Sequence, residues 1–548
     1  MKISNDNRDK PTALLRAEWT AALALTVVAI ALHIIHVKWA GGLWRDEANT
    51  LALATLPDLG QTWKNLPYDS FPILWFLVVR VVGAIAGPSN DIAIRVLGSC
   101  VGLAIIAAVW FYARTFKNAP LLSLAFVAFN PSIIESGDSA RAYGFGIPLI
   151  LVSAALVWRC LERATVPRVA ALITFTIAAV QALYYNSVLT ATICIAALSV
   201  CLLRRQWKPA APIIGAGFLA ALSMLPYMGI IRNVTSWNAV IRIPSYTFPF
   251  FLTKLNDTLS LAGHWVALAW LAAFVLAVVC SVLAVFRRRS TVSDTGREMV
   301  AFQVVALVAS SLGIFLFLKR LSYSTAPWYY LTLIAVAGVT IDALFGVIAK
   351  SPTQRVARLA AALIIAGLSF LPARRAAKTM ESNMDIAARA IAASEKPGDF
   401  IVVNYWFSAV NFARYHRNEV DWLAIPPLAE RRWHRPDLLM NAMKATDQTE
   451  PVRPVIQRIE QALRSGNRVF VVGLVERPAP GDTPVTRQPF LEDLTRGRTG
   501  DYERQWSSMV GYFLSSHATS YREIRVYPPN VFNLHENTRL FVADGWRP

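Results

Sequence analysis

The chain has 548 residues, of which 55% are hydrophobic and only 16% are charged. A soluble protein of this length would carry about a quarter charged residues, so the composition excludes an ordinary soluble enzyme and indicates a protein that crosses a membrane many times. The net charge of +19 does not indicate a nucleic-acid partner, because the basic residues fall in short clusters between apolar runs, as membrane orientation signals do.

Apolar runs of about 20 residues, each long enough to cross about 30 Å of hydrocarbon, recur through the first two thirds of the chain. After Leu371 the sequence becomes charged and Pro-rich. We therefore predict a polytopic α-helical transmembrane module at 1–372 and a soluble domain at 373–548. The polar start and the full length of the first run favour an uncleaved first helix. The eleven expected spans are residues 19–40, 93–113, 119–134, 143–160, 169–185, 187–203, 210–230, 264–286, 299–318, 327–349 and 354–372.

Clusters of Lys and Arg lie in alternate connections between these spans, and the positive-inside rule makes those connections cytoplasmic. The scheme holds only if one further apolar stretch, residues 70–87, does not cross. That stretch is short and contains Arg80, Gly83 and Gly87, so we expect it to lie as a helix on the outer face of the membrane. The basic clusters are the N-terminus (Lys2, Arg8, Lys10, Arg16) and residues 114–117, 159–168, 204–208, 287–297 and 350–358.

The loop after the first span carries three adjacent charges, Arg45, Asp46 and Glu47, in the stretch "GGLWRDEANTLALATL" (41–56). Charges at a helix exit most often only anchor the helix at the interface, and for this loop taken alone that alternative stays open. A carboxylate in low-dielectric surroundings, however, has a raised pKa and can take a proton from an alcohol. The loop is therefore a candidate for a reacting group at the membrane surface.

A second outer loop, "NPSIIESGDSARAYGFGIP" (130–148), carries Glu135, Asp138, Arg141 and Tyr143 at the same membrane depth. The arginine offers a planar fork that fits a phosphate. Two loops with carboxylates and a guanidinium on one face of the membrane indicate a reaction between a hydroxyl and a lipid-linked phosphate.

Four stretches together carry a family resemblance: "LWRDEANTLALA", "YDSFPILWFLVVRVVG", "DIAIRVLGSCVGLAIIAAVWFYAR" and "FNPSIIESGDSARAYGF". Over residues 19–230 the chain resembles the GT-C membrane glycosyltransferases, and within them it is similar to the dolichyl-phosphate-mannose protein mannosyltransferase and lipid A aminoarabinose transferase group. The resemblance implies transfer of one sugar, with inversion, from a polyprenyl-phosphate carrier to an acceptor hydroxyl on an envelope glycan, lipid or protein. It also implies a bacterial inner-membrane protein whose active site and C-terminal domain are periplasmic.

The resemblance further implies roles for single residues. Asp46 matches the base that acts on the acceptor, and Glu47 is a neighbour that positions acceptor or sugar. Asp138, with Glu135 as the alternative, matches the second acid, and Arg141 stands where a phosphate contact is expected. The sequence departs from the family in "STAPWYYLTL" (324–333), where Trp328 replaces the arginine of many relatives. A phosphate contact from this region therefore falls to Lys319 or Arg320, and the secondary candidates are Tyr143, Tyr329 and Tyr330.

Other features are weaker indicators. His33 and His36 could share a metal, but packing histidines are the better interpretation because no third ligand is evident nearby. No cofactor is indicated, and a divalent metal is compatible with the residues without being indicated. Residues 231–263 form the longest outer loop, which could anchor at the interface or cover the lipid tail of the donor. The partners expected are the lipid-linked donor, the envelope acceptor and membrane lipids, with no nucleic acid.

The C-terminal region contains the strand-like runs 399–406, 468–474 and 538–544 among helical stretches such as 383–394 and 454–465, which predicts a small soluble α/β domain. No Gly-rich phosphate loop follows these runs, so nucleotide binding is not expected. Two other functions are alternatives to glycosyl transfer. A transporter or flippase of lipid-linked sugars should have an internal repeat and ionisable groups at mid-membrane, which this sequence lacks. A polysaccharide polymerase usually has basic outer loops.

Overall fold

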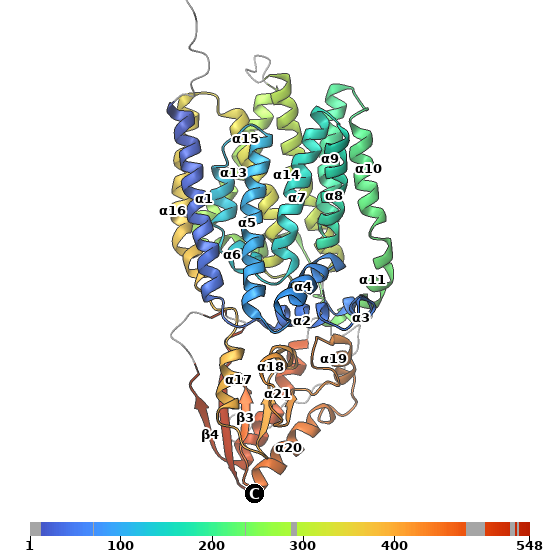
Figure 1. Cartoon of the computed structure of the whole chain (residues 1–548), viewed down its shortest axis with the longest axis vertical. Coiled ribbons are helices and arrows are strands. Elements are labelled where there is room, and N and C mark those ends of the chain that lie inside the picture. Colours follow the sequence, from blue (N-terminus) through green and yellow to red (C-terminus); the bar gives the residue numbers. More distant parts are fainter. Residues whose placement is uncertain are drawn as a thin grey trace, which may run out of the picture.

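The computed structural model describes residues 13–69, 71–235, 237–286, 293–477, 499–526, 532–533 and 536–548. The expected cytoplasmic basic residues Lys2, Arg8 and Lys10 and the cluster Arg287–Arg289 lie outside this part of the chain. The described residues form a bundle of long helices with an α/β domain attached at one end of the bundle (Figure 1).

The bundle consists of long apolar helices, as the sequence predicts. Within the described residues, nine helical segments are long and apolar enough to cross a membrane, and Val166–Ala182 is a slightly shorter apolar helix. The protein is therefore a multi-pass membrane protein. The main bundle helices are α1 (Ala13–Trp39), α5 (Asp91–Thr115), α7 (Ala142–Glu162), α8 (Val166–Ala182), α9 (Asn186–Arg204), α10 (Ala210–Leu222), α13 (His264–Phe286), α14 (Asp294–Leu321), α15 (Leu331–Ile348) and α16 (Pro352–Ala377).

The expected span 119–134 is not one continuous helix. It contains a π-helical turn, Leu124–Ala128, followed by the short helix α6 (Pro131–Gly137). Pro131 cannot donate the backbone hydrogen bond that would continue the first piece. The Asn130 side chain instead caps α6 by accepting from the backbone of Ser132 and Ile133. Because the segment is buried by neighbouring helices, the break exposes no backbone to lipid.

Three short helices lie across the end of the bundle that carries the α/β domain (Figure 1): α2 (Arg45–Ala54), α3 (Leu59–Asn65) and α4 (Ile73–Ala86). The stretch 70–87, expected to stay on the membrane surface, contains α4, whose 14 residues are too few to cross about 30 Å of hydrocarbon. Arg80 fixes α4 to the end of α2 by donating to the carbonyls of Ala54 and Leu56.

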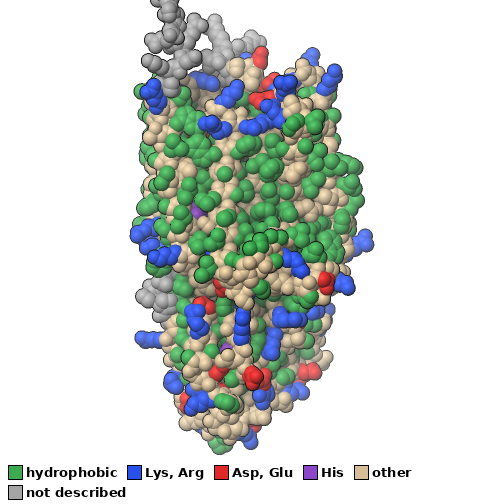
Figure 2. Space-filling view, in the orientation of Figure 1, with side chains coloured by type: hydrophobic (Ala, Val, Ile, Leu, Met, Phe, Trp, Pro, Cys, Tyr) green, Lys and Arg blue, Asp and Glu red, His purple; other side chains and the backbone are tan. Residues whose placement is uncertain are grey.

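The end of the bundle away from the α/β domain is rich in Lys and Arg. Hydrophobic side chains dominate the bundle surface in Figure 2, and Lys and Arg gather beyond them at the end away from the α/β domain. The basic clusters that the sequence places in alternate connections meet at that end, where α5, α7 and α9 finish and α16 begins (Figure 1). A membrane would therefore meet one basic face on that side.

The C-terminal domain is built on a five-stranded sheet with the order β2-β1-β3-β5-β4. Strands β1 (Phe400–Val403), β2 (Trp422–Ala424) and β3 (Val469–Val472) are parallel, and β5 (Leu540–Trp546) pairs antiparallel with both β3 and β4 (Ala518–Ile524). The predicted strand runs correspond to β1, β3 and β5, and the predicted helices to α17 (Met384–Ala392) and α20 (Arg453–Arg464). The expected boundary at 372/373 falls inside α16, which continues to Ala377.

Alternate residues of β1 and β3 face two separate cores, which explains why these strands read as continuous apolar runs. Helices α19 (Pro436–Met443), α20 and α21 (Thr499–His517) cover one face of the sheet. Helices α17 and α18 (Ala409–Tyr415) cover the other. Helix α11 (Met228–Thr235) follows α10 within the candidate span Ala210–Val234, and α12 (Phe248–Ser260) lies in the long 231–263 connection.

Polar contacts attach this domain to the bundle end. Tyr415 of α18 accepts a hydrogen bond from the backbone of Leu43 and donates one to Asp91, both at 2.6 Å. The backbone of Glu381 donates to the carbonyl of Ala40 at 2.7 Å. These contacts hold the α/β domain directly over α2, the helix that begins with the Arg-Asp-Glu sequence.

Candidate active site

Glu47, the second acid of the first loop, is fully buried and bound on all sides. Its Oε1 accepts from Arg95 Nη1 and from the backbone of Ala140, both at 2.7 Å, and its Oε2 accepts from the backbone of Trp44 at 3.1 Å. Arg95 also donates to the carbonyl of Gly42 at 2.6 Å. Glu47 therefore joins the first loop, α5 and the second loop. Both of its carboxylate oxygens accept hydrogen bonds within the protein.

Asp46 has the opposite environment, because its side chain is 24% exposed. Three cationic or ionisable side chains surround its carboxylate: Arg45 at 3.8 Å and Arg141 and His434 each at 4.0 Å. Asp46 lies at the start of α2, where the unpaired backbone N–H groups favour negative charge. Of the two adjacent acids, Asp46 is the one that a substrate can reach.

Arg141 lies behind Asp46 and is 4% exposed. Its Nη1 donates to Thr50 Oγ1 at 2.6 Å, to the carbonyl of Asp46 at 3.0 Å and to Asp69 Oδ2 at 2.9 Å. Among the described residues its Nε has no hydrogen-bond partner. Its Nη2 lies 4.0 Å from Asp46 Oδ2, and the guanidinium also has a side-chain hydrogen bond with Tyr143. The Nε–H donor is thus left for another ligand, such as an oxyanion.

Asp69 was not identified from the sequence, yet it is the closest counter-ion of Arg141, at 2.8 Å. Thr50 also donates to Asp69 Oδ2, at 2.8 Å. The only sequence signal was an acid in the "YDSFP" stretch before α4, which any solvated turn could contain. Asp69 holds the guanidinium in place and neutralises part of its charge.

An aromatic cluster lies beside these charged groups. Tyr143 contacts the rings of Phe71, Trp328 and Tyr329 with centroid separations of 4.9, 6.3 and 5.9 Å. Trp44 meets Trp328 at 5.5 Å. Trp328 therefore lies at the candidate site, where its ring packs against Trp44 and Tyr143. It stands at the position where the sequence departs from the family that it resembles. Stacked and tilted rings next to a carboxylate are suited to the faces of a sugar ring.

Asp138 is more enclosed than a reacting acid would need to be. Its Oδ2 lies 2.6 Å from His33 Nδ1, and the pair is packed against α5. A Cβ on Gly102 would lie 2.3 Å from both Asp138 Oδ1 and His33 Nδ1. Burial raises the pKa of the Asp138 carboxyl to about 6, and the nearby His33 lowers it. His33 is thus a hydrogen-bond partner of the second loop.

Glu135, the alternative second acid, faces the α/β domain. Asn533 donates to Glu135 at 3.2 Å and to Glu381 at 3.3 Å. Glu381 also lies 3.8 Å from His36. Burial, followed by the charge of Glu135, raises the pKa of Glu381 well above its ordinary value. In the described part of the chain, no three His, Cys, Asp or Glu side chains are grouped as a metal site.

The α/β domain contributes two residues that sequence reasoning missed. The backbone of His434 donates to Asn49 at 2.7 Å, which brings its imidazole over Asp46. Burial lowers the pKa of His434, so its ring favours the neutral form. Glu536 pairs with Arg45 at 2.7 Å. Neither residue lies in a recognisable motif, since both reach the site only through domain docking.

Lys319 and Arg320, the expected phosphate contacts, are exposed in the last turn of α14. Over the residues described, neither forms an ion pair with Asp46, Asp69 or another acid of the site. Tyr330 is buried and shares hydrogen bonds with Tyr246 and Thr325 at 2.8 and 2.7 Å. Of the tyrosine candidates, Tyr143 and Tyr329 lie in the aromatic cluster and Tyr330 lies behind it.

Comparison with known proteins gives structural neighbours only. No family model matches the chain, and no curated protein matches it. Its fold is similar to that of ArnT from Cupriavidus metallidurans, solved in the apo state (14% identity, TM-score 0.49, 83% of this chain and 93% of that chain covered) and bound to undecaprenyl phosphate (13%, 0.48, 82% and 92%). It is also similar to the oligosaccharyltransferase AglB from Archaeoglobus fulgidus in complex with an inhibitory peptide and a dolichol-phosphate (10%, 0.49, 83% and 69%).

Both neighbours have the GT-C fold, as the sequence resemblance implied. At identities under 25% and TM-scores under 0.5, this similarity concerns the fold alone.

Proposed function

We propose that this chain is an integral-membrane glycosyltransferase that moves one sugar, with inversion, from a polyprenyl-phosphate carrier to the hydroxyl of an envelope acceptor. The observation that carries the proposal is the pairing of Asp46 and Arg141. A partly exposed carboxylate lies 4.0 Å from a buried guanidinium whose Nε has no hydrogen-bond partner within the described residues. The aromatic cluster beside them offers a surface for the sugar.

Asp46 is the base in this proposal. Its carboxylate takes the proton of the acceptor hydroxyl as the acceptor oxygen bonds to the anomeric carbon of the sugar. The bond from that carbon to the phosphate oxygen breaks, and its electron pair stays on the phosphate. The oxygen enters opposite the leaving phosphate, so the configuration at the anomeric carbon inverts.

Arg141 is the group that receives the leaving phosphate. The Nε–H of its guanidinium can donate a charge-assisted hydrogen bond to the phosphate, and the internal ligands on Nη1 keep the plane of the guanidinium fixed. Glu47 and Asp138 are positioning residues in the same proposal, because each ties its loop to α5 or α1. Glu135, Lys319 and Arg320 remain candidates for contacts with donor or acceptor farther from the transferred sugar.

The sidedness of the site is part of the proposal. Basic residues gather at the bundle end opposite Asp46 (Figure 2), and the positive-inside rule makes that end cytoplasmic. Asp46, Arg141 and the α/β domain at 373–548 are then periplasmic in a bacterial inner membrane. Nucleotide sugars are absent from that compartment, which favours a lipid-linked donor.

A transfer assay with the full-length protein in lipid nanodiscs tests the proposal. The donors are undecaprenyl-phosphate hexoses and pentoses, and the matched nucleotide sugars serve as the comparison. Mass spectrometry of envelope glycolipids from cells with and without the gene identifies the acceptor. We expect release of undecaprenyl phosphate that depends on the lipid-linked donor and on Asp46. Efficient turnover of a nucleotide sugar, or no change in any envelope glycan, would contradict the proposal.

A further inference from the structure

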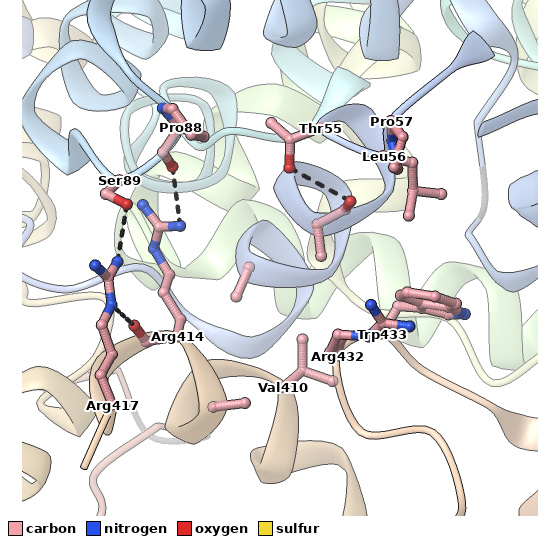
Figure 3. A pocket seen from close by; sticks show the side chains of 13 residues that line it. Thr55, Leu56, Pro57, Pro88, Ser89, Val410, Arg414, Arg417, Arg432 and Trp433 are labelled. Atoms are coloured by element: carbon pink, nitrogen blue, oxygen red, sulfur yellow. Dashed lines mark hydrogen bonds between the residues drawn. The ribbon is translucent and has the colours of Figure 1, made fainter. Parts of the chain in front are cut away.

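A cavity lies between α2 and the α/β domain and has a volume of about 340 Å³ (Figure 3). Its walls come from α2 and the turn that follows it, from the turn between α4 and α5, and from α18 with Arg432 and Trp433 of the α/β domain. Asp46, Arg141 and Asp69 do not line it. The cavity is therefore separate from the candidate active site.

The lining of this cavity combines apolar and cationic side chains (Figure 3). Ala48, Ala52 and Leu56 of the α2 segment and Val410 of α18 supply small apolar surfaces. The charged residues that line it are all arginines, namely Arg414, Arg417 and Arg432. Such a lining fits a ligand that joins an anionic group to an apolar body.

The three arginines are not equally neutralised. Arg414 forms an ion pair with Asp91, and Arg432 pairs with Glu430 at 2.7 Å. Arg417 donates from Nη2 to Ser89 Oγ at 2.8 Å, and its Nε points to the carbonyl of Arg414 (Figure 3). Within the described ranges, Arg417 has no carboxylate partner. One uncompensated positive charge, that of Arg417, thus remains at the cavity, on the side opposite Arg432 (Figure 3).

The position of the cavity along the bundle indicates where its ligand comes from. Pro88 and Ser89 of the α4–α5 turn form part of the wall. This turn is flanked by two strongly exposed apolar side chains, Ile85 at 81% and Ile92 at 73%. Apolar side chains exposed to this degree on a membrane protein face lipid, whereas the adjacent arginines need a polar environment. The cavity is therefore at the level of the lipid phosphates.

We propose that this cavity binds the phosphate headgroup of an anionic membrane lipid, with Arg417 as the phosphate contact. The apolar wall formed by α2 and Val410 receives the glycerol and the start of the acyl chains. A lipid bound there touches the bundle and the α/β domain together, so it strengthens their docking. This inference does not depend on the sugar-transfer chemistry proposed for Asp46.

Thermal unfolding of the purified full-length protein in a neutral detergent tests the proposal. The additions are phosphatidylglycerol, phosphatidylcholine, glycerol phosphate and inorganic phosphate, each over a concentration series. We expect phosphatidylglycerol to raise the Tm in a saturable way, phosphatidylcholine to do so much less, and the two soluble phosphates to have little effect. Equal stabilisation by glycerol phosphate or inorganic phosphate would overturn the lipid as the ligand, because no apolar body would then be needed.

Single substitutions test whether the lipid-dependent rise in Tm comes from this cavity. Arg417→Gln should weaken the apparent affinity for phosphatidylglycerol about fivefold. Ala52→Phe fills the cavity without changing its charge and should abolish the lipid-dependent shift. Arg464→Gln removes an exposed arginine from α20 (side chain 60% exposed), at the far side of the domain, and should leave the shift unchanged (Figure 1). An unchanged shift in both Arg417→Gln and Ala52→Phe, with both variants folded in the absence of lipid, would overturn the site.

Discussion

At the scale of single residues, the two adjacent acids of the first loop have separate tasks. Glu47 is fully buried and accepts three hydrogen bonds, one of them from Arg95. Asp46 keeps a quarter of its side chain exposed and stands between Arg141 and His434. Loss of Glu47 would leave Arg95 as an uncompensated buried charge, which is a stability defect. Loss of the Asp46 charge leaves those buried contacts in place, and we expect it to lower substrate turnover.

The first prediction is for Asp46→Asn in the transfer assay. The amide keeps the shape and hydrogen-bonding reach of the carboxylate but cannot take a proton, so turnover should fall by roughly 10²–10⁴-fold while the Tm stays near that of the wild type. Asp58→Asn is the control, because Asp58 caps α3 in the same loop and an asparagine also caps helices well. Equal activity of the two variants would mean that Asp46 is only an interfacial charge.

Arg141→Lys gives the second prediction. Lysine keeps the positive charge but lacks the guanidinium Nε–H donor, and it cannot hold Thr50, Asp69 and the Asp46 carbonyl with one planar group. We expect the apparent KM for the lipid-linked donor to rise by about tenfold or more, corresponding to one charge-assisted hydrogen bond. Arg389→Lys is the control at an exposed ion pair with Asp385. Unchanged donor dependence in Arg141→Lys would remove the phosphate role.

At the scale of elements, the site depends on how closely the second loop approaches α5. A Cβ on Gly98 would lie 1.8 Å from the carbonyl oxygen of Asp138. The loop therefore packs directly against the helix backbone, and this contact sets the position of Ala140, which donates to Glu47, and of Arg141. The break at Pro131 separates α6 from the preceding π-helical turn, and α6 ends at Gly137, directly before this contact.

The third prediction follows from that contact. Gly98→Ala should lower the Tm, because overpacking a close backbone contact costs about 1–3 kcal/mol. It should also reduce turnover, since the second loop must move away from α5. Gly367→Ala in α16 is the matched control, with nothing within 4 Å of the added Cβ, and alanine there should be neutral or gain up to about 1 kcal/mol of helix propensity. Similar Tm values for both variants would show that the second loop tolerates displacement.

At the scale of the whole molecule, the α/β domain completes the surroundings of Asp46. His434 and Glu536 come from sequence positions nearly 400 residues or more after the first loop, and both lie beside its charges. The pKa of Glu536 is raised from 4.5 to about 7, chiefly by burial; the Arg45 charge opposes this rise and the Asp46 charge adds to it. The docking of the domain is thereby linked to pH.

The sign of this linkage gives the fourth prediction. Because the folded pKa of Glu536 is raised, the stability gained from its proton is fully present below about pH 4.5 and is lost as the pH rises through about 7. Between pH 5 and 8 the wild type should lose up to about 3 kcal/mol that Glu536→Gln does not lose. Denaturation at several pH values measures the difference. Glu460→Gln, at an exposed pair with Arg464, should follow the wild type, and a parallel profile for Glu536→Gln would exclude the linkage.

The fifth prediction concerns orientation. A reporter fused after Gly87 should behave as periplasmic, because α4 lies on the membrane surface, and a reporter fused after Lys350 should behave as cytoplasmic. The two positions lie on opposite sides of the membrane in the topology scheme, so each controls the other. A cytoplasmic signal after Gly87 would invert the proposed sidedness of every later loop, the α/β domain included.

Several features could be predicted from sequence because they depend on local composition. Hydrophobic length identified most of the spans, strand-like runs identified β1, β3 and β5, and the interruptions in 70–87 identified α4 as a helix that does not cross. The two outer loops with Asp46 and Arg141 were found because charged residues are rare next to apolar runs. Each of these signals is contained within about 20 neighbouring residues.

Only the tertiary structure decided which acid of the Asp-Glu pair is accessible, because that depends on Arg95 and Ala140 from distant segments. It also decided that Asp69 holds Arg141, that His434 reaches Asp46, and that Asp138 pairs with His33. The segment 124–134 around the break is mainly hydrophobic, so hydropathy cannot distinguish it from a straight span, although Pro131 marks the break. Burial and ion pairing arise from contacts between residues far apart in the chain. Their energies therefore belong to the packed molecule and to no single stretch of its sequence.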